Sequence, residues 1–221
     1  MVVDAEHVSR AVIVRTSATM AAPLLTFDDG PSESTAEIFE LLRDHRIRAT
    51  FFVIGFRAEQ RSDLVARAGA QGHVIGNHTW DHVALADILN GAAGEGDLER
   101  RVDVVKLKLQ QANEVIAEIL GASPTLFRGP WLNVDERVLE IAGTLGLTHM
   151  GVDVDTCDYD PRYNADYVAN AILAAEADQI VLLHDGTGDE RGGSINPARP
   201  KTVEALRRAL PEFANRWQAP H

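Results

Sequence analysis

Short apolar runs alternate with amphipathic segments along most of this 221-residue chain. The apolar runs are rich in Val, Ile, Leu and Phe, and they are apolar almost throughout, which is typical of strands buried on both faces of a sheet. The runs read PLLTFDD, ATFFVIG, GHVIGNH, PTLFRGP, THMGVDVD and QIVLLHD. We expect each of them to form a strand.

Amphipathic segments predict helices at residues 35–45, 58–69, 98–120, 136–145, 165–175 and 201–215. The longest segment has one apolar stripe at three- and four-residue steps, which indicates a helix with a single buried face. This stripe is made by Leu98, Val102, Val105, Leu109, Ala112 and Ile116. Asp97 precedes the segment, after a predicted loop GAAGEG, and is expected to cap the helix.

The repeated alternation of strand and helix predicts parallel strands joined by right-handed crossovers. Both a barrel and a doubly wound sheet satisfy this pattern. The sequence has no linker, internal repeat or low-complexity segment. Its length suits one α/β domain, so we expect a single domain over residues 1–221.

Composition narrows the range of partners. The formal net charge is -12, which argues against a nucleic-acid partner, and no apolar run approaches the about 18 residues of a membrane helix. One cysteine, Cys157, excludes an internal disulfide framework. The start MVVDAEHVSRAVIV lacks the features of a signal peptide, so we expect a cytoplasmic protein, or a secreted one if this is a mature or trimmed form. The sequence does not predict an oligomeric state.

Polar side chains follow the carboxyl ends of the apolar runs, where side chains of parallel α/β folds converge on one site. These residues are Asp28, Asp29, His78, Arg128, Asp153, Asp155, His184 and Asp185. His78 and His82 are four residues apart, a spacing that on a helical turn places both imidazoles on one face. With a carboxylate from TFDDG they would form an Asp-His-His metal site, which leaves a coordination position open for water.

A metal also gives the adjacent aspartates different tasks. Successive strand residues point to opposite sides, so one carboxylate can bind the metal while its neighbour faces the bound water as a base. A base alone cannot expel an amine leaving group, but His184, from another strand end, could protonate it.

The motifs TFDDGP, NHTWDH, RGPW, DTCDY and LLHD, in this order, resemble those of the polysaccharide deacetylases, which form carbohydrate esterase family 4 and share the NodB-homology domain. The resemblance covers residues 24–185. It implies a distorted, incomplete (β/α) barrel similar to a TIM barrel. It also implies metal-dependent hydrolysis of an N-acetyl or O-acetyl group on an acetylated glycan or a small acylated molecule.

The resemblance also implies a role for individual residues. Asp28 is expected to be the catalytic base, tethered by Arg128, and His184 the general acid, oriented by Asp158. The expected metal ligands are Asp29, His78 and His82. Zn²⁺ is the predicted metal, with Co²⁺, Ni²⁺ or Fe²⁺ as alternatives.

The remaining implied roles concern the substrate. The backbone N–H of Trp131 would stabilise the oxyanion together with the metal. Tyr159 and Leu182 would line the pocket for the acetyl methyl group. The chain departs from the family at Trp131, at Tyr159 and in the long polar loop GTGDERGGSINPARP. These departures alter the groove, so chitin, peptidoglycan, xylan and small acylated molecules all stay open as substrates.

Two alternative functions use the same residues. Two histidines and a carboxylate also form the facial triad of non-haem iron oxygenases, but an oxygenase has no use for the second Asp and the distant His. A non-catalytic binding protein would typically have lost Asp28, His184 or a metal ligand. Histidines outside the motifs, namely His7, His45, His73, His149 and His221, are expected to be surface or hydrogen-bonded residues.

Overall fold

The computed structural model describes residues 21–91, 96–188 and 197–217. The strands are β1 (Leu24–Asp28), β2 (Thr50–Val53), β3 (Val74–Asn77), β4 (Leu126–Phe127), β5 (Thr148–His149), β6 (Val154–Asp155) and β7 (Ile180–His184). The helices are α1 (Thr35–Asp44), α2 (Gly55–Gln60), α3 (Ser62–Ala70), α4 (Leu85–Leu89), α5 (Leu98–Leu120), the 3₁₀ turn η1 (Pro130–Leu132), α6 (Glu136–Thr144), α7 (Ala165–Ala174) and α8 (Pro200–Trp217).

The described strands form one parallel sheet in the order β5-β4-β3-β2-β1-β7-β6. Its two edge strands, β5 and β6, do not pair within the described residues, so the barrel stays open between them. This confirms the prediction of an incomplete (β/α) barrel. Because all strands run in parallel, their carboxyl ends share one edge of the sheet.

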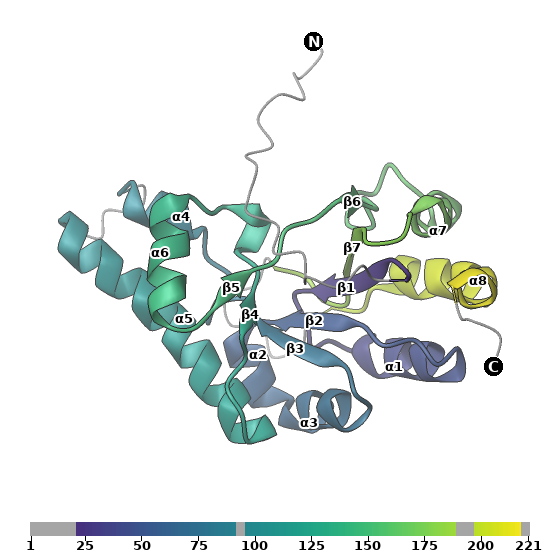
Figure 1. The fold of residues 1–221 in the computed structure, drawn as a ribbon, viewed down its shortest axis with the longest axis horizontal. Helices are drawn as coiled ribbons and strands as arrows, with labels where there is room; N and C mark the ends of the chain where they lie inside the picture. Colours follow the sequence, from purple (N-terminus) through teal and green to yellow (C-terminus); the bar gives the residue numbers. More distant parts are fainter. Residues whose placement is uncertain (1–20, 92–95, 189–196, 218–221) are drawn as a thin grey trace, which may run out of the picture.

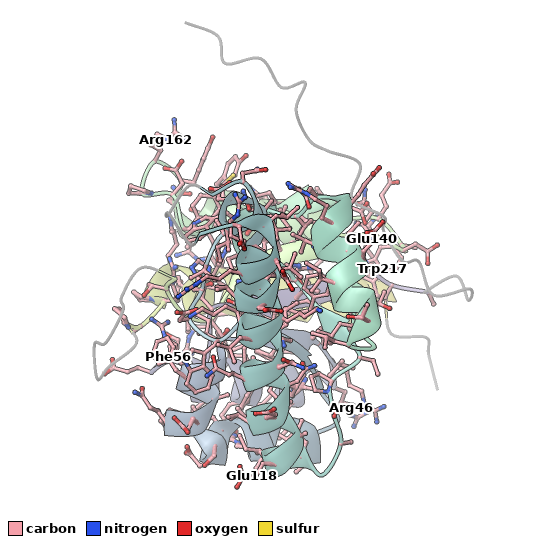
Figure 2. All side chains as sticks on the ribbon, turned by 90° about the vertical axis from the view of Figure 1, so that its left-hand side faces the viewer. Arg46, Phe56, Glu118, Glu140, Arg162 and Trp217 are labelled. Carbon is pink, nitrogen blue, oxygen red and sulfur yellow. The ribbon has the colours of Figure 1, made fainter. Side chains whose placement is uncertain are left out.

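Helices lie around the outside of the curved sheet, with α1, α7 and α8 on one side and α4, α5 and α6 on the other (Figure 1). Figure 2 shows α5 and α6 running beside each other along this second flank. Most of the predicted stripe of α5 packs inward: Val105, Leu109, Ala112 and Ile116 are buried and Val102 is partly buried, but Leu98 in the first turn is 50% exposed. Asp97 caps this helix by accepting a hydrogen bond from the Arg100 N–H (3.0 Å).

Most predicted elements are confirmed, but one predicted helix and one predicted strand are each divided into two elements. The helix expected at 58–69 consists of α2 and α3, because Arg61 between them leaves the helical conformation (φ -126°, ψ 47°). The run 148–155 forms β5 and β6 on opposite edges of the sheet. The chain between them crosses the open side, where Arg128 binds the carbonyls of Met150 and Gly151 in place of a neighbouring strand. The short helix α4 was not predicted.

The main core lies between the sheet and helices α1, α3, α7 and α8. Phe27 of β1 and Phe51 of β2 stack with ring centroids 4.9 Å apart, and Phe39 of α1 meets Phe51 edge-on. Stacked aromatic rings on neighbouring strands fix the register of β1 against β2. This packing holds the end of β1, and with it Asp28, at the edge where the polar residues converge.

Some expectations fall outside the described residues. They concern the N-terminal 20 residues with His7, most of the predicted loop GAAGEG, positions 189–196 of the polar loop after β7, and His221. Within the described ranges, none of the helices combines the length and the apolar character that crossing a membrane requires.

Candidate active site

Asp28 and His184 are direct neighbours at the carboxyl edge of the sheet. They are paired in the register of β1 with β7, and each is the last residue of its strand. Asp29 comes after the end of β1 and has a left-handed backbone (φ 74°). This turn, and not strand alternation as the sequence suggested, is what brings both carboxylates into one cavity. The two aspartates therefore approach the same space from different directions.

Arg128 fixes the orientation of Asp28. Its Nη1 donates to Asp28 Oδ1 (2.8 Å) and to Thr26 Oγ1 (2.8 Å). Asp28 Oδ2 is turned the other way and lies 3.9 Å from His78 Nε2. The guanidinium is fully buried, which would be costly for an unpaired charge. The Asp28 carboxylate and main-chain carbonyls compensate this cost.

Asp29, His78 and His82 form a buried cluster whose three ligand atoms lie within 4.8 Å of one another. Asp29 Oδ1 is 3.2 Å from His78 Nε2 and 3.0 Å from His82 Nε2. His78 Nδ1 donates to the Arg128 carbonyl (2.7 Å), so that Nε2 is the ring nitrogen that faces Asp29. One carboxylate oxygen and two imidazole nitrogens are a donor set that suits a divalent transition metal.

The electrostatics of the cluster agree with a cation site. Burial raises the pKa of Asp29, but hydrogen bonds from His78 and His82 and the nearby charge of His184 hold it well below its usual range. Burial lowers the pKa of His78, but the carboxylates of Asp28 and Asp29 more than reverse this effect. The two carboxylates thus favour positive charge at the cluster, which protonated histidines or a metal ion can provide.

The spacing of His78 and His82 suggested a helical turn, but the two residues do not lie on one. The segment between them is a non-helical turn with left-handed backbone at Thr79 (φ 64°) and at His82 (φ 54°). Asn77 stabilises the turn, since its Oδ1 accepts from the Thr79 N–H (2.7 Å) and its Nδ2 donates to the Leu109 carbonyl of α5 (2.8 Å). The helix α5 therefore supports the histidine pair from outside the site.

His184 is held by Asp158. Its Nδ1 donates to Asp158 Oδ1 (2.7 Å), while Asp158 Oδ2 accepts from the His184 N–H (2.8 Å) and from Thr202 Oγ1 (2.7 Å). Burial alone would lower the pKa of His184, but the charge of Asp158 and its hydrogen bond raise it to about 9. The imidazole is therefore protonated at neutral pH and has a proton to donate.

A cavity of about 320 Å³ opens above these groups. Its wall includes the three residues expected to meet the substrate, namely Trp131, Tyr159 and Leu182. The Trp131 ring meets His82 edge-on with centroids 4.3 Å apart, and Tyr159 meets His184 at 5.4 Å. Both aromatic side chains are largely exposed, so they offer flat surfaces at the mouth of the cavity.

Some residues near the site were missed or misjudged from the sequence. Leu132, Gly188 and Arg199 also line the cavity; no role was expected for Leu132, whereas Gly188 and Arg199 belong to the polar loop 186–200 that was expected to alter the groove. Asp155, expected near the site, accepts from the Tyr159 hydroxyl (3.0 Å) and from the Cys157 N–H (2.8 Å). His149 was expected to be exposed or hydrogen-bonded.

His149 is instead buried beside Phe127, and neither ring nitrogen has a hydrogen-bond partner among the described residues. Its place on the edge strand β5 explains this burial, because helix α6 packs against β5. Burial lowers the pKa of His149 to about 4, so the side chain is neutral and acts as an apolar packing residue at neutral pH.

The sequence profile of the polysaccharide deacetylase family matches residues 18–150. A chitooligosaccharide deacetylase of Sinorhizobium fredii is 37% identical over 196 residues, which span 87% of this chain and 85% of that protein. A peptidoglycan-N-acetylglucosamine deacetylase of Bacillus cereus is 31% identical over 191 residues, or 86% of this chain and 62% of that protein.

The fold of this chain also resembles that of a solved structure. A family 4 acetyl xylan esterase from Clostridium thermocellum, in complex with a cobalt ion, is 27% identical. It superimposes with a TM-score of 0.71 over 88% of this chain and 84% of its own chain. The similarity therefore extends over most of both chains.

Proposed function

Because this chain belongs to the polysaccharide deacetylase family, we propose that it removes N-acetyl groups from N-acetylglucosamine units of a glycan, with a divalent metal held by Asp29, His78 and His82. The observation that carries the proposal is the buried Asp-His-His cluster directly beside a second, arginine-held carboxylate, Asp28. We expect Zn²⁺, with Co²⁺, Ni²⁺ or Fe²⁺ as alternatives. The motifs and the cavity belong to one catalytic domain, for which we propose the bounds 1–221.

Two relatives suggest the class of substrate. One is named for chitooligosaccharides and the other for peptidoglycan, and both polymers contain N-acetylglucosamine. The exposed rings of Trp131 and Tyr159 at the cavity mouth support a sugar substrate, since flat aromatic surfaces pack against sugar rings. An O-acetyl group on a glycan is the second substrate that this cavity could take.

Asp28 is the proposed base. A metal bound by the cluster would polarise the acyl oxygen and lower the pKa of a water molecule. Asp28 Oδ2 faces this position, because Arg128 occupies the other carboxylate oxygen, and it takes the proton as the water oxygen attacks the acyl carbon.

His184 is the proposed acid. The carbon–nitrogen bond breaks as the amine nitrogen receives the proton of His184, so that acetate and a free amine leave. The Asp158 carboxylate keeps the imidazole protonated and directs its Nε2 to the cavity. The backbone N–H of Trp131, in the cavity wall, is the proposed donor to the developing oxyanion.

The test is an acetate-release assay on protein from which metal has been removed and then restored. The panel contains chitin oligosaccharides, peptidoglycan, acetylxylan and N-acetylated small molecules, and oxygen consumption is recorded in parallel. We expect acetate release from an N-acetylglucosamine polymer that stops on metal removal. Metal-loaded, folded protein that releases no acetate, or that consumes oxygen instead, would contradict the proposal.

The Asp28→Asn variant tests the base directly. It should keep its metal and lose turnover by about 10²- to 10⁴-fold, because the amide cannot accept the proton. Asp44→Asn is the matched control, since Asp44 is an exposed residue at the end of α1, and it should keep full activity. Full turnover by Asp28→Asn would remove Asp28 from the mechanism.

A further inference from the structure

The two turns that carry the proposed metal ligands come from different strands. Asp29 follows β1, whereas His78 and His82 follow β3, and β2 separates these strands in the sheet. Both turns contain left-handed residues, which cost free energy and persist only where surrounding contacts hold them. The structure must therefore contain contacts that fix one turn relative to the other.

Residues 54–57, at the end of β2 and the start of α2, contact both turns. The Ile54 N–H donates to the Gly30 carbonyl (3.1 Å), next to Asp29. The Gly55 and Phe56 N–H groups donate to the carbonyls of Thr79 and Trp80 (2.8 and 3.1 Å), between the two histidines. These bonds join the two turns through a single short stretch of chain.

Arg57 completes this arrangement with its side chain. Only 4% of its surface is exposed, which is unusual for an arginine without a structural or functional reason. Its Nη1 donates to the Asp29 carbonyl (3.0 Å) and to the Thr187 carbonyl. One buried guanidinium thus binds the backbone of a proposed metal ligand and the backbone of the chain that follows β7.

The chain that follows β7, residues 185–188, packs against both turns. The Asp185 N–H donates to the Asp28 carbonyl (3.1 Å), and the Asp185 carbonyl accepts from Ser32 Oγ. Gly188, at the other end of this segment, lies so close to His82 that a Cβ at position 188 would overlap its imidazole ring. The segment 185–188 therefore limits the orientation that the His82 ring can take.

We infer that Arg57 is a positioning residue for the metal site. By binding the carbonyls of Asp29 and Thr187 together, it sets the Asp29 carboxylate and keeps residues 185–188, with Gly188, against the His82 ring. Arg57 itself does not line the cavity, and both of these bonds go to backbone carbonyls, so it acts through the residues that it holds. The inference rests on the metal site of the proposed function and adds the residue that preorganises it.

The experiment compares Co²⁺ affinity of metal-free protein by chelator competition and by the visible spectrum of bound Co²⁺. Arg57→Met keeps the length of the side chain but removes its donors. It should weaken Co²⁺ binding by about 10- to 100-fold, as loss of a group that orients metal ligands usually does, and change the Co²⁺ spectrum. Arg57→Lys, which restores one positive donor, should recover part of the affinity.

Arg61→Met is the matched control, because Arg61 ends the same helix but is partly exposed and paired with Asp63 (3.1 Å). It should bind Co²⁺ like the wild type. Urea unfolding of each metal-free variant separates the two roles of Arg57. A variant Arg57→Met that is less stable but binds Co²⁺ with unchanged affinity and spectrum would make Arg57 a structural residue only and would overturn the inference.

Gly188→Ala provides the test if Arg57→Met fails to fold, because the added methyl group is small and the segment lies outside the core. It should displace His82 and weaken Co²⁺ binding; wild-type affinity in this folded variant would overturn the inference. The proposed function fails separately. A wild-type chain that binds no Co²⁺ would overturn the proposed site together with this inference, whereas equal binding by wild type and variants would overturn the inference alone.

Discussion

Asp28 and Asp29 are adjacent residues with the same side chain, yet they have different partners. Arg128 binds Asp28, and two imidazoles surround Asp29. The charged partners compensate the cost of burying each carboxylate, and the left-handed backbone of Asp29 keeps the two groups from competing for the same partner. For these two aspartates, the groups that surround the side chain, and not its chemical identity, distinguish the two residues.

The protonation of His184 depends on Asp158, and this dependence can be measured. The Asp158 charge raises the pKa of His184 to about 9, so its removal should lower that pKa. In Asp158→Asn we expect the alkaline limb of the kcat/KM profile, where the acid loses its proton, to move to lower pH. Thr202→Val is the control, since it removes a hydrogen bond to Asp158 but leaves the charge. An unmoved alkaline limb in Asp158→Asn would exclude His184 as the group that titrates there.

Asp185 is a buried carboxyl group whose titration should reduce stability. Burial, with the charges of Asp29 and Asp28, raises its pKa to about 7 despite a hydrogen bond from Thr35. The folded chain therefore keeps a proton that the unfolded chain loses above about pH 4, and stability falls as pH rises from there through 7.

In metal-free protein, Asp185→Asn should remove this fall, because an amide stays neutral. Urea unfolding between pH 5 and pH 8 should show the variant gaining on the wild type, by up to about 1.4 kcal/mol per pH unit. Parallel curves for the two proteins would show that Asp185 does not titrate in this range.

The sequence motifs found the charged residues at strand ends and two of the residues that hold them, Arg128 and Asp158, but not the residues that hold the turns of the metal cluster. Asp28, Asp29, His78, Arg128 and His184 were predictable because they follow apolar runs whose carboxyl ends must meet. Arg57 was not predictable, because in an amphipathic segment an arginine is usually solvated, and only the fold brings it under the site. Gly188 lies in the polar loop that was expected to alter the groove, but its contact with His82 was not predictable, since glycine is common in any polar loop.

At the scale of elements, apolar pattern predicted where strands occur better than where they end. The run 148–155 is apolar enough for one strand, but the open barrel needs an edge strand on each side, so the run is divided. Local pattern has no information about this division, because it depends on whether the sheet closes. The predicted helix 98–120, by contrast, was correct to the residue, since its stripe and its cap are both local.

Two glycines, one at the end of a helix and one inside a helix, offer a matched pair of substitutions. Gly121 ends α5 in the left-handed region (φ 74°), whereas Gly143 lies inside α6, and a Cβ at either position would meet no atom within 4 Å. Gly121→Ala should lower the free energy of unfolding by about 1 to 2 kcal/mol, from backbone strain alone. Gly143→Ala should raise it by about 0.4 to 1 kcal/mol, because alanine loses less entropy in a helix.

Urea unfolding of both variants at the same pH provides the measurement. Opposite signs are expected, since the space around the two positions is equally open and only the backbone conformation differs. Two changes of the same sign would show that the conformation of Gly121 does not control the end of α5.

At the scale of the whole molecule, the proposed metal would connect parts of the barrel that are distant in sequence. Its proposed ligands follow β1 and β3, so a bound ion would link the segment around Asp29 to the segment that contains His78 and His82. The unfolded chain cannot hold three ligands in this geometry, so binding must favour the folded state. Metal binding should therefore be visible as stability of the entire chain.

We expect Zn²⁺ at 100 times its dissociation constant to raise the free energy of unfolding of metal-free protein by about 2.7 kcal/mol. For a chain of this length, that gain corresponds to roughly 5 to 10 °C in the thermal midpoint. His78→Ala should abolish the shift, because two of the three proposed ligands remain, and Asp28→Asn should retain it, because Asp28 is held by Arg128 and is not among the proposed ligands. A shift that disappears in Asp28→Asn but persists in His78→Ala would reverse the assignment of base and ligand, and would place the metal on the other side of the aspartate pair.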